Sequence, residues 1–265
     1  MPKVIKTSIE LICAALHAAI SRLLCRRPCR VVLLYHGVGK THLAGFRKQM
    51  AYLARTCSVV KPSEIMTGCG EETKTVVALT FDDGLVSVLE NVLPVLKEYG
   101  LPAGVFVPTG SLAQRPDWVM YSERPDGDET VMNEQQIAAL DHEGLEISSH
   151  TVSHLALADL EDSGLEAELV DSKRRLEEIL GHKVSGISYP YGACDDRVHQ
   201  AAQKAGYKMG FTVEPNRVDG ATERLRIGRF EVSPCETFLR FKLKVDGAYH
   251  VAKYLRRLKA ILSRS

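Results

Sequence analysis

The chain alternates short apolar runs with longer amphipathic stretches. Runs rich in Val, Leu, Ile and aromatic residues, bounded by Gly, Pro or polar residues, are typical of buried strands. The pattern predicts seven strands: Arg30–Tyr35, Val76–Phe81, Gly104–Val107, Leu145–Ser148, Gly186–Tyr189, Met209–Thr212 and Arg226–Glu231.

Between these runs, apolar residues recur at every third or fourth position, which is typical of helices packed on one face. Several of these stretches end at a glycine, such as Gly100 or Gly181, that can close a helix. Strands that alternate with helices imply a parallel sheet in an α/β fold. The predicted helices are 46–55, 87–99, 133–143, 165–180 and 196–205.

Both ends of the chain have amphipathic patterns. Within residues 1–28, the stretch around Leu11–Ile20 is too short and too polar for a membrane span. The apolar positions of this segment recur with a helical period, which favours an amphipathic helix over a signal peptide. Residues 246–265 predict a basic amphipathic helix. Either helix could lie on an anionic membrane or pack on the central domain, residues 29–245.

Composition narrows the class of partner and compartment. The 265 residues contain 34 Lys and Arg against 33 Asp and Glu, a net charge of +1, so nucleic acid is not favoured as a partner. Seven irregularly spaced cysteines resemble reduced thiols more than a disulfide framework. We therefore expect a cytoplasmic protein, or one peripheral to a membrane, rather than a secreted one.

Polar residues that could bind a metal or take part in catalysis follow four of the predicted strands. These are His36, the pair Asp82-Asp83, His150 and Tyr191. In a parallel α/β barrel the carboxyl ends of all strands share one mouth, so these side chains are expected to meet.

Neighbouring residues of a regular strand point to opposite faces, so Asp82 and Asp83 can serve one site only if the strand has ended and the chain is turning. Gly84 permits such a turn. His150 and His154 face the same side if their segment is a helical turn. An isolated Asp-Asp-Gly is also typical of a β-turn, and an isolated histidine pair of a surface. Together, however, two histidines and one carboxylate form a metal-binding set with open coordination positions.

Three segments carry a resemblance to a known family. They are Thr80-Phe81-Asp82-Asp83-Gly84, His150-Thr151-Val152-Ser153-His154 and Tyr189-Pro190-Tyr191-Gly192. They resemble the first three motifs of the polysaccharide deacetylase family, also called the NodB-homology or carbohydrate esterase 4 family. The resemblance spans His36 to Glu231 and implies a distorted (β/α)7 barrel.

The resemblance also implies an activity and roles for individual residues. The family hydrolyses N-acetyl groups of amino sugars, most often N-acetylglucosamine in a glycan, and so acts on carbon–nitrogen bonds of linear amides. Asp83, His150 and His154 would bind a divalent metal, usually Zn²⁺, with Co²⁺ or Ni²⁺ as alternatives. Asp82 would be the general base, and the backbone N–H of Tyr191 would stabilise the oxyanion.

The sequence departs from the commonest family pattern in several places. The late Leu-x-x-His that usually supplies the acid is absent, and His36 in Tyr35-His36 resembles the early Tyr-His of exopolysaccharide-type members; we assign His36 as the acid. Ser188 stands where an arginine is frequent, and the fourth motif is not recognisable. We hypothesise that Arg229, on the seventh strand, reaches Asp82 and keeps it ionised; the alternative is a surface arginine.

Two other functions are open at this point. A non-catalytic carbohydrate-binding descendant would share the fold, although it would be expected to lose a ligand or the base. A P-loop-like nucleotide hydrolase is suggested by Gly39-Lys40-Thr41, but the glycine needed five residues earlier is Leu34. For the deacetylase, the expected substrate is an exopolysaccharide, a cell-surface glycan or a lipid-linked saccharide, the last with peripheral membrane contact.

Overall fold

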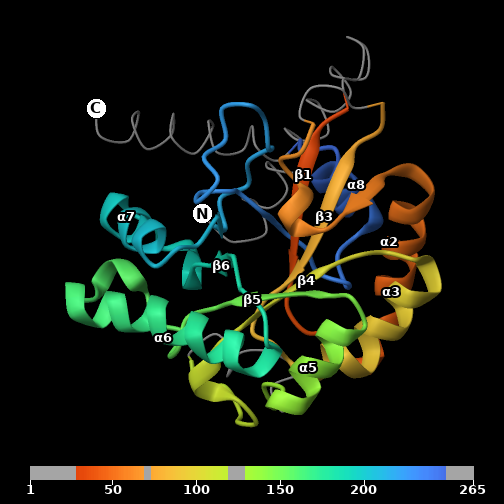
Figure 1. Cartoon of the computed structure of the whole chain (residues 1–265). Helices are drawn as coiled ribbons and strands as arrows, with labels where there is room; N and C mark the ends of the chain where they lie inside the picture. Colours follow the sequence, from red (N-terminus) through yellow and green to blue (C-terminus); the bar gives the residue numbers. More distant parts are fainter. Residues whose placement is uncertain (1–27, 69–72, 119–128, 249–265) are drawn as a thin grey trace, which may run out of the picture.

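The structure is a computed structural model that describes residues 28–68, 73–118 and 129–248. These residues form an eight-stranded sheet in which every ladder between named strands is parallel, in the order β7-β6-β5-β4-β3-β1-β8 with β2 paired to β3 (Figure 1). The strands are β1 (Arg30–Tyr35), β2 (Ser58–Val60), β3 (Val76–Phe81), β4 (Gly104–Val107), β5 (Glu146–Ser149), β6 (Gly186–Ser188), β7 (Met209–Phe211) and β8 (Phe230–Glu231).

The segment before β8 joins the two edges of the sheet. Ile227 bridges Phe211 of β7, while Phe230 pairs with Leu33 of β1. The sheet therefore curves into the distorted β/α barrel that the sequence predicts.

All seven predicted strands are present and form the main path of the sheet, but one further strand, β2, was not predicted. β2 lies in a stretch that has no clear apolar periodicity, and it pairs with the first three residues of β3. On the same side of β3, β4 pairs only with Thr80 and Phe81. The short β2 thus fills the space where β3 and β4 diverge. The predicted strand at 226–231 is also shorter than expected, since only Phe230 and Glu231 form a ladder.

Helices surround the strands (Figure 1). Gly100 and Gly181 end α3 and α6 with φ values of 64° and 74°, a conformation that glycine adopts without strain. The helix α8 was not predicted, although it lies within the central domain and buries Phe241, Leu243 and Val245. The helices are α2 (Leu43–Thr56), α3 (Leu93–Tyr99), α5 (Glu134–His142), α6 (Asp162–Leu180), α7 (Asp196–Lys204) and α8 (Phe238–Val245).

The helix predicted over 87–99 has two parts. Its first turn, Val88–Val92, is a π-helix, and α3 follows it directly. Pro94 has no N–H to donate to the carbonyl of Glu90, so an α-helical turn would lose a hydrogen bond there. The wider turn instead lets Leu93 N–H bond to Val88 O.

The two central strands, β1 and β3, are buried along their whole length. Alternate residues, such as Leu33 and Leu79, pack toward the helices in the main core. Those between them, such as Val32 and Ala78, pack inside the barrel with Phe106 and other residues. Burial on both faces explains the continuous apolar runs in the sequence and gives the strand ends a rigid base.

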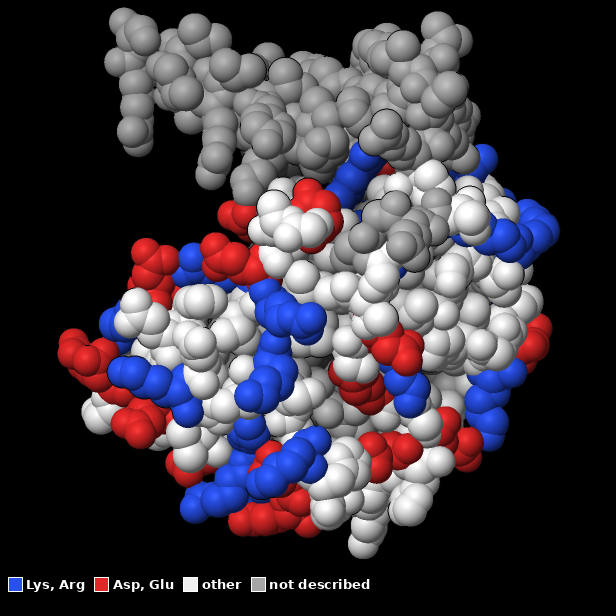
Figure 2. All heavy atoms as spheres, turned by 45° about the horizontal axis from the view of Figure 1, so that its top comes forward, with Lys and Arg blue, Asp and Glu red and all other residues white. Residues whose placement is uncertain are grey.

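Several predictions fall outside the described residues. The N-terminal amphipathic helix and nearly all of the C-terminal segment are among them, so the proposed domain limits stay predictions. No helix in the described part of the chain is long and apolar enough to cross a membrane. On the face in Figure 2, acidic and basic side chains are interspersed, in keeping with the balanced composition.

Candidate active site

A pocket of about 210 Å³ opens at the carboxyl ends of the strands. It brings together six of the seven residues that the sequence singled out, and the seventh, Arg229, lies directly beneath it against Asp82. The lining residues are Leu34, His36, Asp82, Asp83, Trp118, His150, His154, Tyr191, Val213 and Glu231.

The two aspartates share the pocket because β3 has ended. Asp82 N–H still bonds to Tyr35 O at 2.9 Å, as in a ladder, but Asp83 has a φ of 70° and Gly84 a φ of 58°. Asp83 therefore turns toward the side on which Asp82 already lies. Both carboxylates are almost fully buried.

His150 and His154 converge by a different geometry from the one expected. Their segment is not a helical turn, because Thr151 and His154 have φ values of 68° and 54°. Left-handed backbone at non-glycine residues costs about 1–3 kcal/mol each and persists only when the surroundings enforce it. Here Ser149 Oγ accepts from Thr151 N–H, and Thr151 Oγ1 accepts from His154 N–H.

Glu168 of α6 also stabilises this loop. Its Oε2 accepts the backbone N–H groups of Val152 and Ser153 at 2.8 and 2.9 Å. Sequence analysis missed this residue, although a signal was present: Glu168 interrupts the apolar stripe that includes Leu165 and Leu169. A charged residue on the buried face of a helix generally has a specific partner.

The positions of Asp83, His150 and His154 fit a metal ion. Their candidate ligand atoms all lie within 4.8 Å of one another. Asp83 Oδ1 is 3.6 Å from His150 Nε2 and 3.5 Å from His154 Nε2, and it is buried with no hydrogen-bond partner among the described residues. Ligands about 2.0–2.1 Å from a tetrahedral Zn²⁺ would be roughly 3.3–3.4 Å apart. Asp83 Oδ1 is thus separated from both histidine nitrogens as ligands of one ion are, and not as hydrogen-bonded pairs are.

The protonation states of His154 and Asp83 also favour metal binding. Burial, helped by the nearby charge of His150, lowers the pKa of His154 to about 3, so its imidazole is neutral at neutral pH. Burial would raise the pKa of Asp83, but the neighbouring His150, 3.6 Å away, and the charges of the other surrounding histidines outweigh burial and lower it. His150 Nδ1 lies 2.8 Å from Ser188 O, and donation to this carbonyl leaves Nε2 facing the pocket.

Arg229 lies against Asp82, where the sequence analysis expects it, but it precedes β8 instead of lying within the strand. Nη1 and Nη2 donate to the two carboxylate oxygens of Asp82 at 2.7 and 2.8 Å. Burial would raise the pKa of Asp82, yet the Arg229 charge, followed by that of His150, outweighs burial and lowers it.

The rest of the guanidinium is also satisfied. Its remaining donors bond to Thr212 O, Thr80 Oγ1 and Ser188 Oγ, and its side chain has 0% exposure. Ser188 Oγ in turn donates to Asp82 Oδ2 at 3.1 Å. The small side chain of Ser188 therefore contacts a guanidinium that comes from the segment before β8.

The aromatic wall of the pocket was only partly expected. Tyr191 is in the left-handed region with a φ of 58° and is 44% exposed. Trp118 is the last described residue before 119–128, and its ring stacks on His154. No role was predicted for Trp118, Val213 or Glu231.

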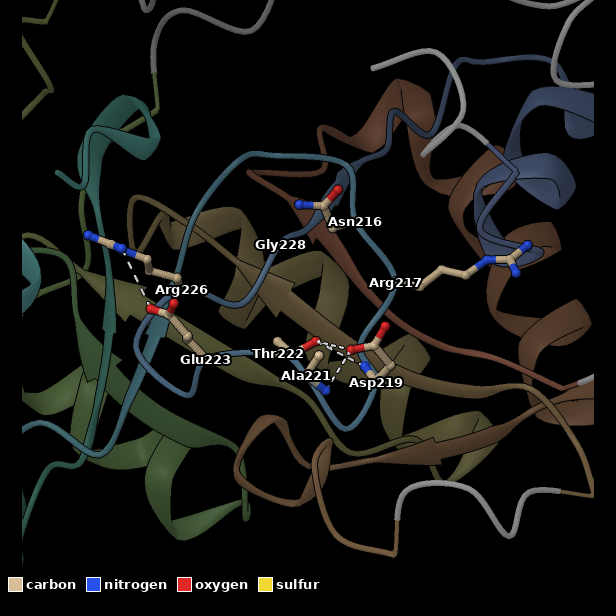
Figure 3. A pocket seen from close by; sticks show the side chains of 8 residues that line it. All are labelled: Asn216, Arg217, Asp219, Ala221, Thr222, Glu223, Arg226 and Gly228. Atoms are coloured by element: carbon tan, nitrogen blue, oxygen red, sulfur yellow. Dashed lines mark hydrogen bonds and ion pairs between the residues drawn. The ribbon is translucent and has the colours of Figure 1, made fainter. Parts of the chain in front are cut away.

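A second and larger pocket, of about 540 Å³, is lined by residues of the segment that joins β7 to β8 (Figure 3). None of the predicted site residues lines it. Its polar groups already have partners: Asp219 accepts from Thr222 Oγ1 and Ala221 N–H, Arg226 pairs with Glu223 and Asp196, and Arg217 donates to the carbonyls of Asp246 and Gly247. It lacks the histidine and carboxylate set of the first pocket.

Comparison with known proteins decides the family. Residues 70–210, more than half of the chain, match the profile of the polysaccharide deacetylase family. The chain belongs to this family. The protein is therefore a hydrolase of the polysaccharide deacetylase type, and the P-loop interpretation of Gly39-Lys40-Thr41 is wrong.

Curated relatives are named as deacetylases. The chain is 28% identical over 218 residues to the "Putative polysaccharide deacetylase YxkH" of Bacillus subtilis, covering 78% of this chain and 73% of that protein. It is 27% identical over 168 residues to the poly-beta-1,6-N-acetyl-D-glucosamine N-deacetylase of Staphylococcus aureus strain MRSA252. That match covers 62% of this chain and spans only 57% of the staphylococcal protein.

Solved structures show the same fold. The deacetylase PplD of Streptococcus pyogenes, in complex with acetate, has a TM-score of 0.67 at 22% identity, covering 83% of this chain and 99% of PplD. IcaB from Ammonifex degensii has a TM-score of 0.66 at 23% identity, covering 84% and 98%. These likenesses establish the barrel architecture of the polysaccharide deacetylase fold.

Proposed function

We propose that this polysaccharide deacetylase is a metal-dependent enzyme that removes N-acetyl groups from amino sugars, of the N-acetylglucosamine type, in a glycan. The observation that carries the proposal is the convergence of Asp83, His150 and His154 beside a second carboxylate, Asp82. Asp82 is paired with the Arg229 guanidinium and is not one of the three candidate ligands.

Asp83, His150 and His154 would hold the ion, with Zn²⁺ as the first choice and Co²⁺ or Ni²⁺ as alternatives. When bound, such a metal supplies Lewis-acid polarisation of the acetyl carbonyl and of the attacking water, and three protein ligands leave positions open for both.

The side chains of the pocket divide the proton transfers between them. Asp82, kept ionised by Arg229, accepts a proton from the water molecule while the water oxygen attacks the acetyl carbon. The backbone N–H of Tyr191 would donate to the acetyl oxygen as negative charge develops there. His36, across the pocket, would protonate the sugar nitrogen as the carbon–nitrogen bond breaks, which yields acetate and a free amine.

The proposal is tested by metal analysis together with acetate release. Purified protein should release acetate from N-acetylated glucosamine oligomers, lose this activity after chelation and regain it with one equivalent of Zn²⁺ or Co²⁺. Asp83→Asn should lose both metal and activity, whereas Asp82→Asn should lose activity while keeping metal. A chain that binds the oligomers but releases no acetate with any of these metals would instead be a non-catalytic carbohydrate-binding protein.

The form of the substrate is a finer part of the proposal. The staphylococcal relative is named for a poly-N-acetylglucosamine, and exposed Tyr191 and Val213 at the pocket could contact the apolar face of a sugar ring. A lipid-linked saccharide, processed at a membrane surface by a peripheral protein, fits the amphipathic patterns at the chain ends. Flotation with anionic liposomes tests this idea, since protein that stays wholly in the soluble fraction would contradict it.

A further inference from the structure

The two histidines of the candidate metal site are held in different ways. The ring of His150 has the arrangement that is usual for metal-binding histidines, with Nδ1 against the Ser188 carbonyl at 2.8 Å. The ring of His154 does not: its Nδ1 is buried and has no hydrogen-bond partner within residues 28–68, 73–118 and 129–248.

Aromatic contacts surround the His154 ring instead. The indole of Trp118 stacks on it with centroids 4.2 Å apart and planes 21° apart. Tyr191 meets it edge to face at 5.0 Å and 70°. Trp118 is only 9% exposed, so its ring is itself held in place by packing.

We propose that Trp118 is a positioning residue that orients the His154 imidazole for metal binding by stacking, in place of a hydrogen bond to Nδ1. The inference rests on the proposed function, because it concerns the affinity of the Asp83, His150 and His154 set for its ion.

Stacking favours the metal-bound state in particular. A metal at Nε2 draws electron density from the imidazole and leaves the ring partly positive, and the face of an indole attracts positive charge more strongly than the face of a Tyr or Phe ring does. Loss of Trp118 should therefore weaken metal binding more than it weakens folding. Loss of a group that orients a metal ligand typically lowers affinity by about 10–100-fold.

The first test is the zinc dissociation constant, measured by competition with a chromophoric chelator, for Trp118→Phe, Trp118→Leu and Trp118→Ala. We expect Phe, which keeps a flat ring, to stay within about threefold of the parent. Leu and Ala should weaken binding by about tenfold or more. Leu fills space without a π face, so the difference between Phe and Leu separates stacking from simple packing.

Tyr52→Ala provides the matched control. Tyr52 contacts the rings of Phe238 and Phe241 on α8 and does not line the pocket, so its loss should lower the thermal midpoint and leave zinc affinity unchanged.

Fluorescence gives a second readout without any substitution, because Trp118 is the single tryptophan of the chain. One equivalent of Co²⁺ should strongly quench its emission, and a chelator should restore it. Leu and Ala variants that bind zinc within twofold of the parent, or parent emission unaffected by bound Co²⁺, would overturn the inference. A parent protein that binds no divalent metal would overturn the proposed function itself.

Discussion

Replacement of Arg229 is the most direct test of whether this residue keeps the proposed base, Asp82, ionised and oriented. Two charge-assisted hydrogen bonds join Arg229 to Asp82, and bonds of this kind contribute about 1.5–3 kcal/mol each. Because about 1.4 kcal/mol corresponds to a tenfold rate, loss of even one bond in the transition state should lower kcat/KM by tenfold or more. Arg229→Lys keeps the charge but not the two-pronged geometry, so it should fall between the parent and Arg229→Ala.

The same substitution should also destabilise the protein. Removal of Arg229 leaves a buried carboxylate without its cation, which typically costs 3–5 kcal/mol out of a total of about 5–15 kcal/mol. Rates must therefore be compared at equal folded fraction, as measured by circular dichroism. In Asp82→Asn/Arg229→Gln both charges are gone, and this double variant should unfold at a higher temperature than Arg229→Gln alone.

The assay is acetate release from N-acetylated glucosamine oligomers at saturating zinc, with metal content checked for each variant. If Arg229→Ala and Arg229→Lys retain parent metal content and kcat/KM within twofold of the parent, Arg229 has no part in the mechanism. If the double variant is no more stable than Arg229→Gln, the buried pair is not the source of the destabilisation.

Three further predictions concern the loop, the acid and a surface pair. Glu168→Ala should raise the zinc dissociation constant about tenfold, because the N–H groups of the histidine loop lose their acceptor, whereas Glu168→Gln should preserve most of the affinity; equal losses in both would contradict this. His36→Gln should slow amide hydrolysis by about 10²–10⁴ but spare an aryl acetate, whose leaving group needs no proton, and a similar loss on both substrates would exclude an acid role. The hydrogen bond to Asp141 raises the pKa of His182, so the stability that it adds is complete below about pH 6.5 and is lost as pH rises through the raised value; in an NMR titration Asp141→Asn should return this pKa toward about 6.5.

The sequence was sufficient for most of the fold because β1 and β3 are buried on both faces and read as unbroken apolar runs. β2 was missed because its three residues, one exposed and two half-buried, carry no such pattern, and its place depends on where β3 and β4 diverge. Short elements of this kind are set by tertiary packing rather than by local sequence.

Site residues that lie in short local motifs could be predicted from the sequence. Those that contact the site from distant parts of the chain were harder to predict. Asp83, His150 and His154 were identified as ligands through the family resemblance, but the backbone that brings the histidines together is left-handed and not helical. Glu168 and Trp118 act on these residues from other elements, and no local pattern relates them to the histidines. Arg229 was expected near Asp82, while its other bonding partners were visible only in the structure.

The pairing of Asp82 with Arg229 joins residues 147 positions apart in the chain. Arg229 immediately precedes β8, the strand that completes the sheet next to β1. A ribosome-bound polypeptide that has emerged only as far as β7 would therefore contain all the proposed metal ligands, but its base, Asp82, would not yet be paired with Arg229. Competence for catalysis should then arise late in biosynthesis, at the moment of barrel closure. Fragments that end before residue 229 should be inactive even when they are supplied with zinc.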